Sequence, residues 1–129
     1  MNALAPPPER AGAVRVAIGT HSGVRVSEHF GQATRFEIWE VTPDGARLVE
    51  TRVNRPACGS GGDDRAEALM DASVATVADC RAVVVARIGE CALSRLDKLG
   101  VLAFESEDPV DATLRELANY AALFERRTA

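Results

Sequence analysis

An unbroken apolar run, Ala-Val-Val-Val-Ala at residues 82–86, constrains the fold of this chain more than any other stretch. A strand with one face in water alternates apolar and polar side chains, whereas a strand covered on both faces is apolar throughout, as in parallel sheets. We therefore predict a central strand here, with packed elements on both of its faces.

The patterns on either side of this run predict an α/β domain. Alternating or β-rich segments favour strands at 14–19, 24–27, 35–41, 47–53 and 101–104, and helical apolar spacing favours helices near 63–78, 91–99 and 109–127. Two expected hairpins, 14–19 with 24–27 and 35–41 with 47–53, come first, and strand–helix crossovers follow. The order of these six candidate strands predicts a mixed sheet, antiparallel at its start and parallel at its finish, with helices packed on it, and we expect the sheet to be five-stranded.

The length of 129 residues predicts one core and one domain. Residues 1–12 include three consecutive prolines and no periodicity, so we expect a disordered N-terminal arm followed by a folded domain over 13–125. Within the domain, Gly100 is expected to end one helix, and the last helix is expected to begin with Asp108 as its cap and Pro109 at its first position.

Charge and composition exclude several classes of function. The net charge of −4 lacks the basic field that carries nucleic-acid affinity, so no nucleic-acid partner is expected. Neither a membrane-spanning run nor the basic start and apolar core of a signal peptide is found, so we expect a cytoplasmic protein without a membrane partner. The three cysteines are then free thiols or ligands rather than a disulfide framework.

Residues 24–33 contain the first candidate site residue, His29. We expect a short half-buried strand that breaks into a turn, with Phe30 as an anchor and Gly31 at a positive φ. His29 is either a turn histidine that is hydrogen-bonded to the backbone or a metal ligand at a strand end. His21, the other histidine, is more simply an exposed turn residue.

The cysteines differ in their surroundings. Cys58 lies in a glycine-rich loop, where it is either an incidental thiol or a ligand. Cys91 lies at a predicted helix start, which favours a thiolate, although it could instead pack on the sheet. Cys80 directly precedes the buried strand and is most simply a core residue. Their spacing does not predict a closed tetrahedral zinc site.

Two segments favour an anionic ligand. Residues 59–62, Gly-Ser-Gly-Gly, lead into one predicted helix, and Arg87 and Gly89 lead into another, where backbone N–H groups can bind an anion. Neither segment matches a nucleotide-phosphate motif. Asp63 and Asp64 could be catalytic carboxylates, but helix capping explains them without further assumptions.

Four stretches of the sequence together form a recognisable pattern: Val-Arg-Val-Ala-Ile-Gly at 14–19, Val-x-x-His-Phe-Gly-x-Ala-x-x-Phe at 26–36, Asp-Cys-Arg-Ala-Val-Val-Val-Ala-Arg-Ile-Gly at 79–89, and Leu-Gly-Val at 99–101. With these stretches the sequence resembles the nitrogenase iron-molybdenum cofactor-binding family, which includes the NifX and NafY carriers and the C-terminal domain of NifB. The resemblance covers residues 13–124, and its most specific part is the His-Phe-Gly turn.

This resemblance implies a ribonuclease-H-like fold without catalytic activity. The expected role is a carrier or chaperone in nitrogen fixation that transiently binds an iron-sulfur or iron-molybdenum cluster, of the NifB-cofactor or FeMo-cofactor type. Its partners would be a cluster synthase, a scaffold or apo-dinitrogenase. The radical-SAM cysteine motif of full-length NifB is absent from this sequence, so a stand-alone carrier without synthetic activity is expected.

The site residues carried over from the family are His29 as a cluster ligand and Cys58 as a second or transient ligand. Arg87, Gly89 and the two helix starts would neutralise the charge of the cluster, and a few weak ligands suit release better than four thiolates would. Two alternatives stay open: a metal-free interaction or regulatory module of the assembly system, and a carrier of another molybdenum, copper or iron cluster. A nuclease is disfavoured because the first strand carries no carboxylate.

Overall fold

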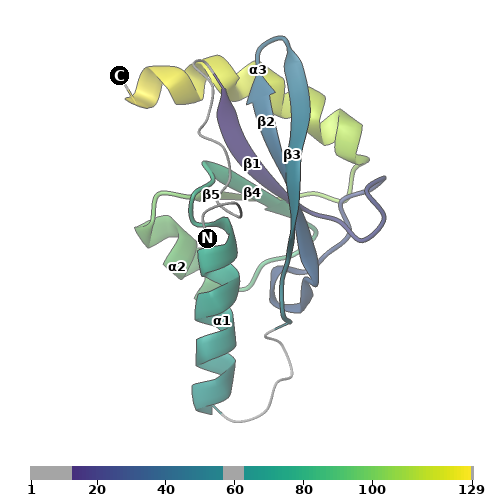
Figure 1. Cartoon of the computed structure of the whole chain (residues 1–129). Coiled ribbons are helices and arrows are strands. Elements are labelled where there is room, and N and C mark those ends of the chain that lie inside the picture. Colours follow the sequence, from purple (N-terminus) through teal and green to yellow (C-terminus); the bar gives the residue numbers. More distant parts are fainter. Residues whose placement is uncertain (1–12, 57–62, 129) are drawn as a thin grey trace, which may run out of the picture.

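The computed structural model describes residues 13–56 and 63–128, which form a five-stranded sheet between layers of helices (Figure 1). The expected arm, residues 1–12, lies outside the described residues. The elements are β1 Val14–Gly19, the 3-10 helix η2 Phe30–Gln32, β2 Arg35–Thr42, β3 Gly45–Val53, α1 Asp63–Val77, β4 Ala82–Val85, α2 Glu90–Lys98, β5 Leu102–Glu105 and α3 Val110–Thr128.

The strand order is β3-β2-β1-β4-β5. The pairs β1–β2 and β2–β3 are antiparallel, whereas β1–β4 and β4–β5 are parallel. This confirms the predicted mixed five-stranded sheet, antiparallel at its start and parallel at its finish. All residues of β4 are buried, as its unbroken apolar run predicts for an inner strand.

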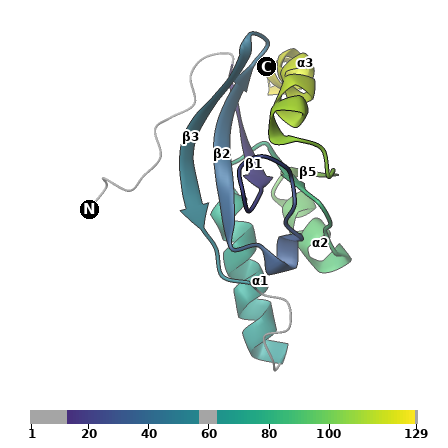
Figure 2. The same cartoon turned by 90° about the vertical axis from the view of Figure 1, so that its right-hand side faces the viewer.

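The helices cover both faces of the sheet (Figure 2). One face packs against α1 and α2 through a core cluster that includes Val77, Val83 and Leu96. The other face packs against α3 through a cluster that includes Val16, Val84 and Leu114. Alternate residues of β4 therefore contribute to different cores, which is why no polar residue interrupts the strand.

The expected strand at 24–27 is wrong. Outside the named strands, Arg25 forms a single antiparallel bridge with Pro109 at the start of α3. Val24 is 70% exposed, whereas Val26 is buried on the α3 side of the sheet. A hairpin with β1 is impossible because β1 is already paired on both edges, with β2 on one side and β4 on the other.

Two further local details differ from expectation, and a third agrees with it. Gly31 lies in η2 and is not among the positive-φ residues; the turn before it has its positive φ at Gly23, 83°. Gly100, with a φ of 77°, follows α2 as predicted. At the start of α3, the first helical bond runs from the Thr113 N–H to the Pro109 carbonyl, so Pro109 rather than Asp108 occupies the cap position.

A bidentate ion pair fastens β3 to the end of α1. The guanidinium of Arg52 donates to both carboxylate oxygens of Asp79, at 2.7 and 2.9 Å, and to the carbonyl of Thr76 at 2.8 Å. It also donates to Glu50 at 2.9 Å. The hydrogen bonds from Arg52 hold the pKa of Asp79 below its ordinary value, against the opposing effect of burial.

We expect Asp79→Asn to lower the free energy of unfolding at pH 7 by about 1 kcal/mol, a small effect because the Asp79 side chain is 42% exposed and solvent screens the pair. Since the folded state lowers the pKa, the stabilisation is present above the ordinary pKa and is lost as the pH falls through the folded pKa. The difference from wild type should therefore shrink below about pH 4 in urea unfolding. Asp97→Asn, at an exposed position on α2, is the control and should change little.

Candidate functional site

Residues 20–34, between β1 and β2, cross the end of the sheet at which the parallel strands β1, β4 and β5 finish. Val26 is buried in the core beneath α3, whereas Phe30 is buried in the core beneath α1 and α2. The segment therefore wraps from one face of the sheet to the other around the carboxyl ends of the strands. Open α/β sheets often bind their ligands at this end.

Backbone hydrogen bonds hold the crossing segment against the sheet. The carbonyl of Gly19, at the end of β1, accepts the N–H groups of Ser27 and Glu28 at 3.1 and 3.2 Å. The N–H of Val26 donates to the carbonyl of Asp108, before α3, at 3.0 Å. The position of the next residues is thus set by β1 and by the start of α3.

His29 follows directly and pairs with the end of β4. The N–H of Ala86 donates to the Glu28 carbonyl, and the N–H of Phe30 donates to the Arg87 carbonyl, each at 2.8 Å. His29 and Arg87 thereby form a parallel β-bridge. These residues are far apart in the sequence and lie side by side because the segment that carries His29 crosses the sheet just beyond the end of β4.

The side chains on either side of this bridge point in different directions. Phe30 is fully buried, and its ring lies 5.6 Å from that of Phe36. The imidazole of His29 is exposed, and it makes no hydrogen bond or ion pair with any part of the chain that the structure describes. It does not make the backbone hydrogen bond that a purely structural turn histidine was expected to make, and it is open to a ligand.

The start of α2, at Glu90, lies three residues beyond Arg87. Gly89 is the N-terminal cap of this helix and supplies no side-chain hydrogen bond to it. The turn before the cap is fixed by Glu105, at the end of β5, whose carboxylate accepts the N–H of Ile88 at 2.9 Å. An exposed cation, Arg87, and a helix N-terminus thus lie close in the chain to the bridge with His29, which is a setting that favours anions.

Of the other candidate residues that the structure describes, Cys91 lies at the start of α2, whereas Cys80 lies away from the bridge between His29 and Arg87. Cys58 and the glycine-rich loop lie outside the described residues. Cys91 is exposed in the first turn of α2. Cys80 is buried just before β4, at the opposite end of that strand, and burial raises its pKa to about 12, so it stays a neutral thiol. His21 is exposed in the turn after β1.

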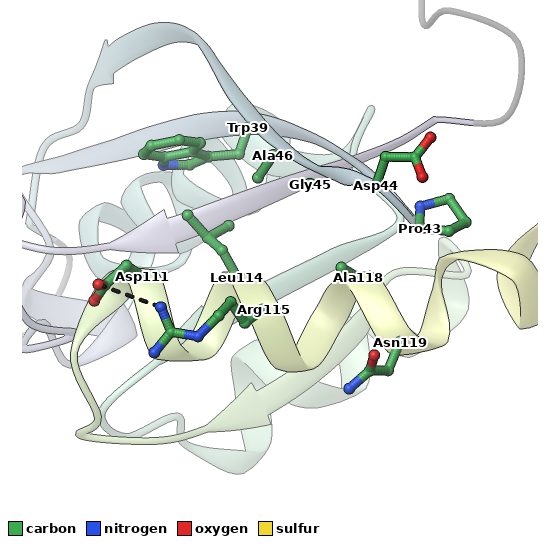
Figure 3. A pocket seen from close by; sticks show the side chains of 10 residues that line it. All are labelled: Trp39, Pro43, Asp44, Gly45, Ala46, Asp111, Leu114, Arg115, Ala118 and Asn119. Atoms are coloured by element: carbon green, nitrogen blue, oxygen red, sulfur yellow. Dashed lines mark ion pairs between the residues drawn. The ribbon is translucent and has the colours of Figure 1, made fainter.

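Within the described residues, no group of three or more His, Cys, Asp or Glu side chains is placed to hold a metal ion. A cavity of about 550 Å³ lies between the β2–β3 hairpin and α3, where Trp39 faces Leu114 (Figure 3). None of the candidate residues lines it. The His29 site is therefore an exposed surface at the end of the sheet, separate from this cavity.

Two residues that shape the site were not identified from the sequence. Glu105 fixes the turn before α2, and Gly19 receives the hydrogen bonds of the crossing segment. Gly19 ends the predicted strand 14–19 and Glu105 directly follows the predicted strand 101–104, and this position at strand ends is the signal that could have identified them. Their specific contacts depend on packing between distant segments.

Comparison with known proteins places this site in context. Residues 12–120 match the family model described as dinitrogenase iron-molybdenum cofactor. The FeMo cofactor biosynthesis protein NifB of Frankia alni is 34% identical over 114 residues, which cover 88% of this chain and 22% of that protein. The chain therefore spans about a fifth of the length of this curated relative.

Solved structures share the fold at low sequence identity. The crystal structure of PH0822 has a TM-score of 0.61 and 16% identity, covering 81% of this chain and 89% of the other. A structure from Methanocaldococcus jannaschii has a TM-score of 0.54 and 14% identity, covering 84% and 91%. No helix in the described part of the chain is both long enough and apolar enough to span a membrane.

Proposed function

Since this chain belongs to the dinitrogenase iron-molybdenum cofactor family, we propose that it binds and carries an iron-sulfur or iron-molybdenum cluster during assembly of the nitrogenase cofactor. The observation that carries the proposal is the exposed imidazole of His29, bridged through the backbone to Arg87 at the end of the sheet. The cluster is cargo, of the NifB-cofactor or FeMo-cofactor type. The protein is a carrier without catalytic activity, and it works with a cluster synthase, a scaffold or apo-dinitrogenase.

The residues present fit a cargo better than a permanent centre. A resident iron-sulfur cluster is held by several thiolates, whereas the described part of this site offers one imidazole, one guanidinium and the start of α2, whose first turn carries a single exposed thiol, that of Cys91. In this proposal His29 supplies a nitrogen ligand, and Arg87 and the N–H groups after Gly89 balance the negative charge of the cluster. Cys58, which lies outside the described residues, supplies a second or transient ligand. So few ligands allow transfer to a partner.

The architecture supports a finer assignment of the fold. We assign the domain to the ribonuclease-H-like class, because its order β3-β2-β1-β4-β5 combines an antiparallel meander with two parallel strands. The carboxyl ends of β1 and β4, where a nuclease of this class would need several carboxylates on a metal, present His29 and Arg87. In this proposal the end of the sheet that binds a metal ion in a nuclease binds an anionic cluster in this domain.

The test is anaerobic binding of a purified iron-sulfur cofactor precursor to the apo-protein. We expect wild type to retain iron through gel filtration, with visible and EPR spectra of the bound cluster, and His29→Ala to retain it at least about tenfold less tightly. The exposed position of His29 predicts a change in unfolding free energy within about 0.5 kcal/mol, measured in urea.

His21→Ala is the matched control, since it removes the other exposed histidine of the same crossing segment. It should bind the cluster like wild type. Equal retention of iron by wild type and His29→Ala would contradict the assignment of the ligand. If wild type itself retained no iron, the carrier proposal would fail, and a metal-free interaction module would take its place.

A further inference from the structure

The carboxylate of Glu105 reaches from the end of β5 to the turn that joins β4 to α2. The backbone of Glu105 is fixed, because it pairs with Val85 at the end of β4 and because the next residue, Ser106, donates its N–H to the Val85 carbonyl at 2.9 Å. From this fixed point the side chain of Glu105 accepts the N–H of Ile88 at 2.9 Å. The ends of two neighbouring parallel strands therefore set the position of a residue just before α2.

The turn at residues 86–89 is held from two sides. On one side, the crossing segment bonds through its backbone to the N–H of Ala86 and to the carbonyl of Arg87. On the other side, the N–H of Ile88 donates to Glu105, and Gly89 adds no side-chain hydrogen bond at the cap of α2. Among the described residues, Glu105 is thus the side chain that fixes the backbone directly before the first N–H groups of α2.

The negative charge of Glu105 does not neutralise the cation beside it. Arg87 is exposed, and its guanidinium forms no ion pair with any part of the chain that the structure describes. The carboxylate bonds instead to the backbone of the next residue, Ile88. A negative charge close to a site for an anion is unfavourable by itself. A favourable contribution of Glu105 to anion binding must therefore come from its hydrogen bond.

We propose that Glu105 is a positioning residue for the start of α2. The first N–H groups of a helix have no partner within the helix, and they are the groups that bind anions. The hydrogen bond from Ile88 to Glu105 orients these groups, at residues 90–92, so that they and Arg87 face the same anion. This inference rests on the proposed function for the identity of that anion, the cluster. The orientation of the N–H groups itself can be measured with any small anion.

Two variants separate the length of the side chain from its charge. Glu105→Gln keeps the length and still offers an oxygen to the Ile88 N–H, but it carries no charge. Glu105→Asp keeps the charge, but it is one methylene shorter, so its carboxylate no longer reaches that N–H. We expect Glu105→Gln to bind anions like wild type and Glu105→Asp to bind them more weakly. If the charge decided the matter, the order of the two variants would be reversed.

The probe is sulfate, titrated at constant ionic strength into the isotopically labelled full chain, and the readout is the NMR signals of the backbone amides of residues 90–92. We expect these signals to shift and to saturate in wild type. The half-saturating concentration should change less than about threefold in Glu105→Gln and rise about tenfold in Glu105→Asp, which is the weight of one hydrogen bond to a charged group. All variants should unfold at the same urea concentration, because the Glu105 side chain is exposed.

Glu116→Gln, at an exposed position on α3, is the matched control for the change in net charge and should bind sulfate like wild type. The positioning role is overturned if the amides of residues 90–92 do not respond to sulfate, if Glu105→Asp binds like wild type, or if Glu105→Gln binds as weakly as Glu105→Asp. Anaerobic retention of iron is then measured on the same variants, and the same order is expected. If the sulfate results hold but wild type retains no iron, the carrier function fails and the positioning role of Glu105 stands.

Discussion

Phe30→Ala is expected to lower the free energy of unfolding by about 3–5 kcal/mol, the range for removing a fully buried aromatic side chain from a core. Phe30 has no exposed surface, and its ring packs at 5.6 Å from that of Phe36 beneath α1 and α2. The N–H of Phe30 donates to the Arg87 carbonyl, which holds the backbone in place. The segment therefore cannot move inward to fill the space that the ring leaves. Urea unfolding followed by circular dichroism measures the loss.

The same change should also weaken the cluster binding that we propose, although the Phe30 side chain itself is covered. Its ring anchors the segment that carries His29, so the variant loses the fixed position of the imidazole as well as stability. Val24→Ala is the control: it truncates an apolar residue of the same segment that is 70% exposed, and its expected effect is within about 0.5 kcal/mol. A loss below about 1 kcal/mol for Phe30→Ala would show that the ring is not the anchor.

A strand of the sheet could be predicted where burial of the whole strand determines which residues are apolar. The apolar run at β4 reports that both faces are covered, and it remains apolar because α1, α2 and α3 all pack near it. The predicted order, with hairpins first and strand–helix crossovers later, was likewise enough to predict that the sheet is antiparallel in its first half and parallel in its second. In such cases the local composition of a strand reflects the distant elements that pack on it.

The error at residues 24–27 shows where this reasoning ends. Val24 and Val26 alternate as a half-buried strand does, but alternation says nothing about whether a neighbouring edge is free. Since β2 and β4 occupy both edges of β1, the segment pairs instead with the start of α3. The competition between partners is decided by strands that come later in the chain.

The candidate site was predictable in part for a related reason. His29 was identified after a predicted strand that the structure does not contain, and Arg87 was identified as a residue that leads into a helix start. The structure joins them in one β-bridge because residues 20–34 cross the carboxyl ends of the strands. The contacts that support them were not predictable: the hydrogen bond from the Ile88 N–H to the Glu105 carboxylate joins segments 17 residues apart, just beyond the ends of two neighbouring strands. Such a contact is not encoded in any local pattern.

Gly19→Ala is expected to destabilise the fold by about 1–3 kcal/mol and to weaken the proposed cluster binding at the same time, because overpacking at this position displaces the segment that carries His29. A Cβ at Gly19 would lie 2.8 Å from Cγ1 of Val85 and 3.2 Å from Cβ of Glu28. Val85 is a fully buried, β-branched residue with little freedom to move, so Glu28 must give way.

That movement acts directly on the site. The Glu28 N–H is bonded to the Gly19 carbonyl, and the Glu28 carbonyl accepts the Ala86 N–H next to the bridge between His29 and Arg87. Relief of the clash therefore separates the segment from β4. Urea unfolding and anaerobic iron retention are measured on the same preparation.

Gly89→Ala is the matched control for stability, since a Cβ at Gly89 meets nothing within 4 Å. It should unfold like wild type. If Gly19→Ala lost stability but bound the cluster normally, the segment could shift without moving the imidazole, and the position of His29 would not depend on the end of β1. If neither quantity changed, Val85 would have adjusted instead, and the close approach at Gly19 would not constrain the site.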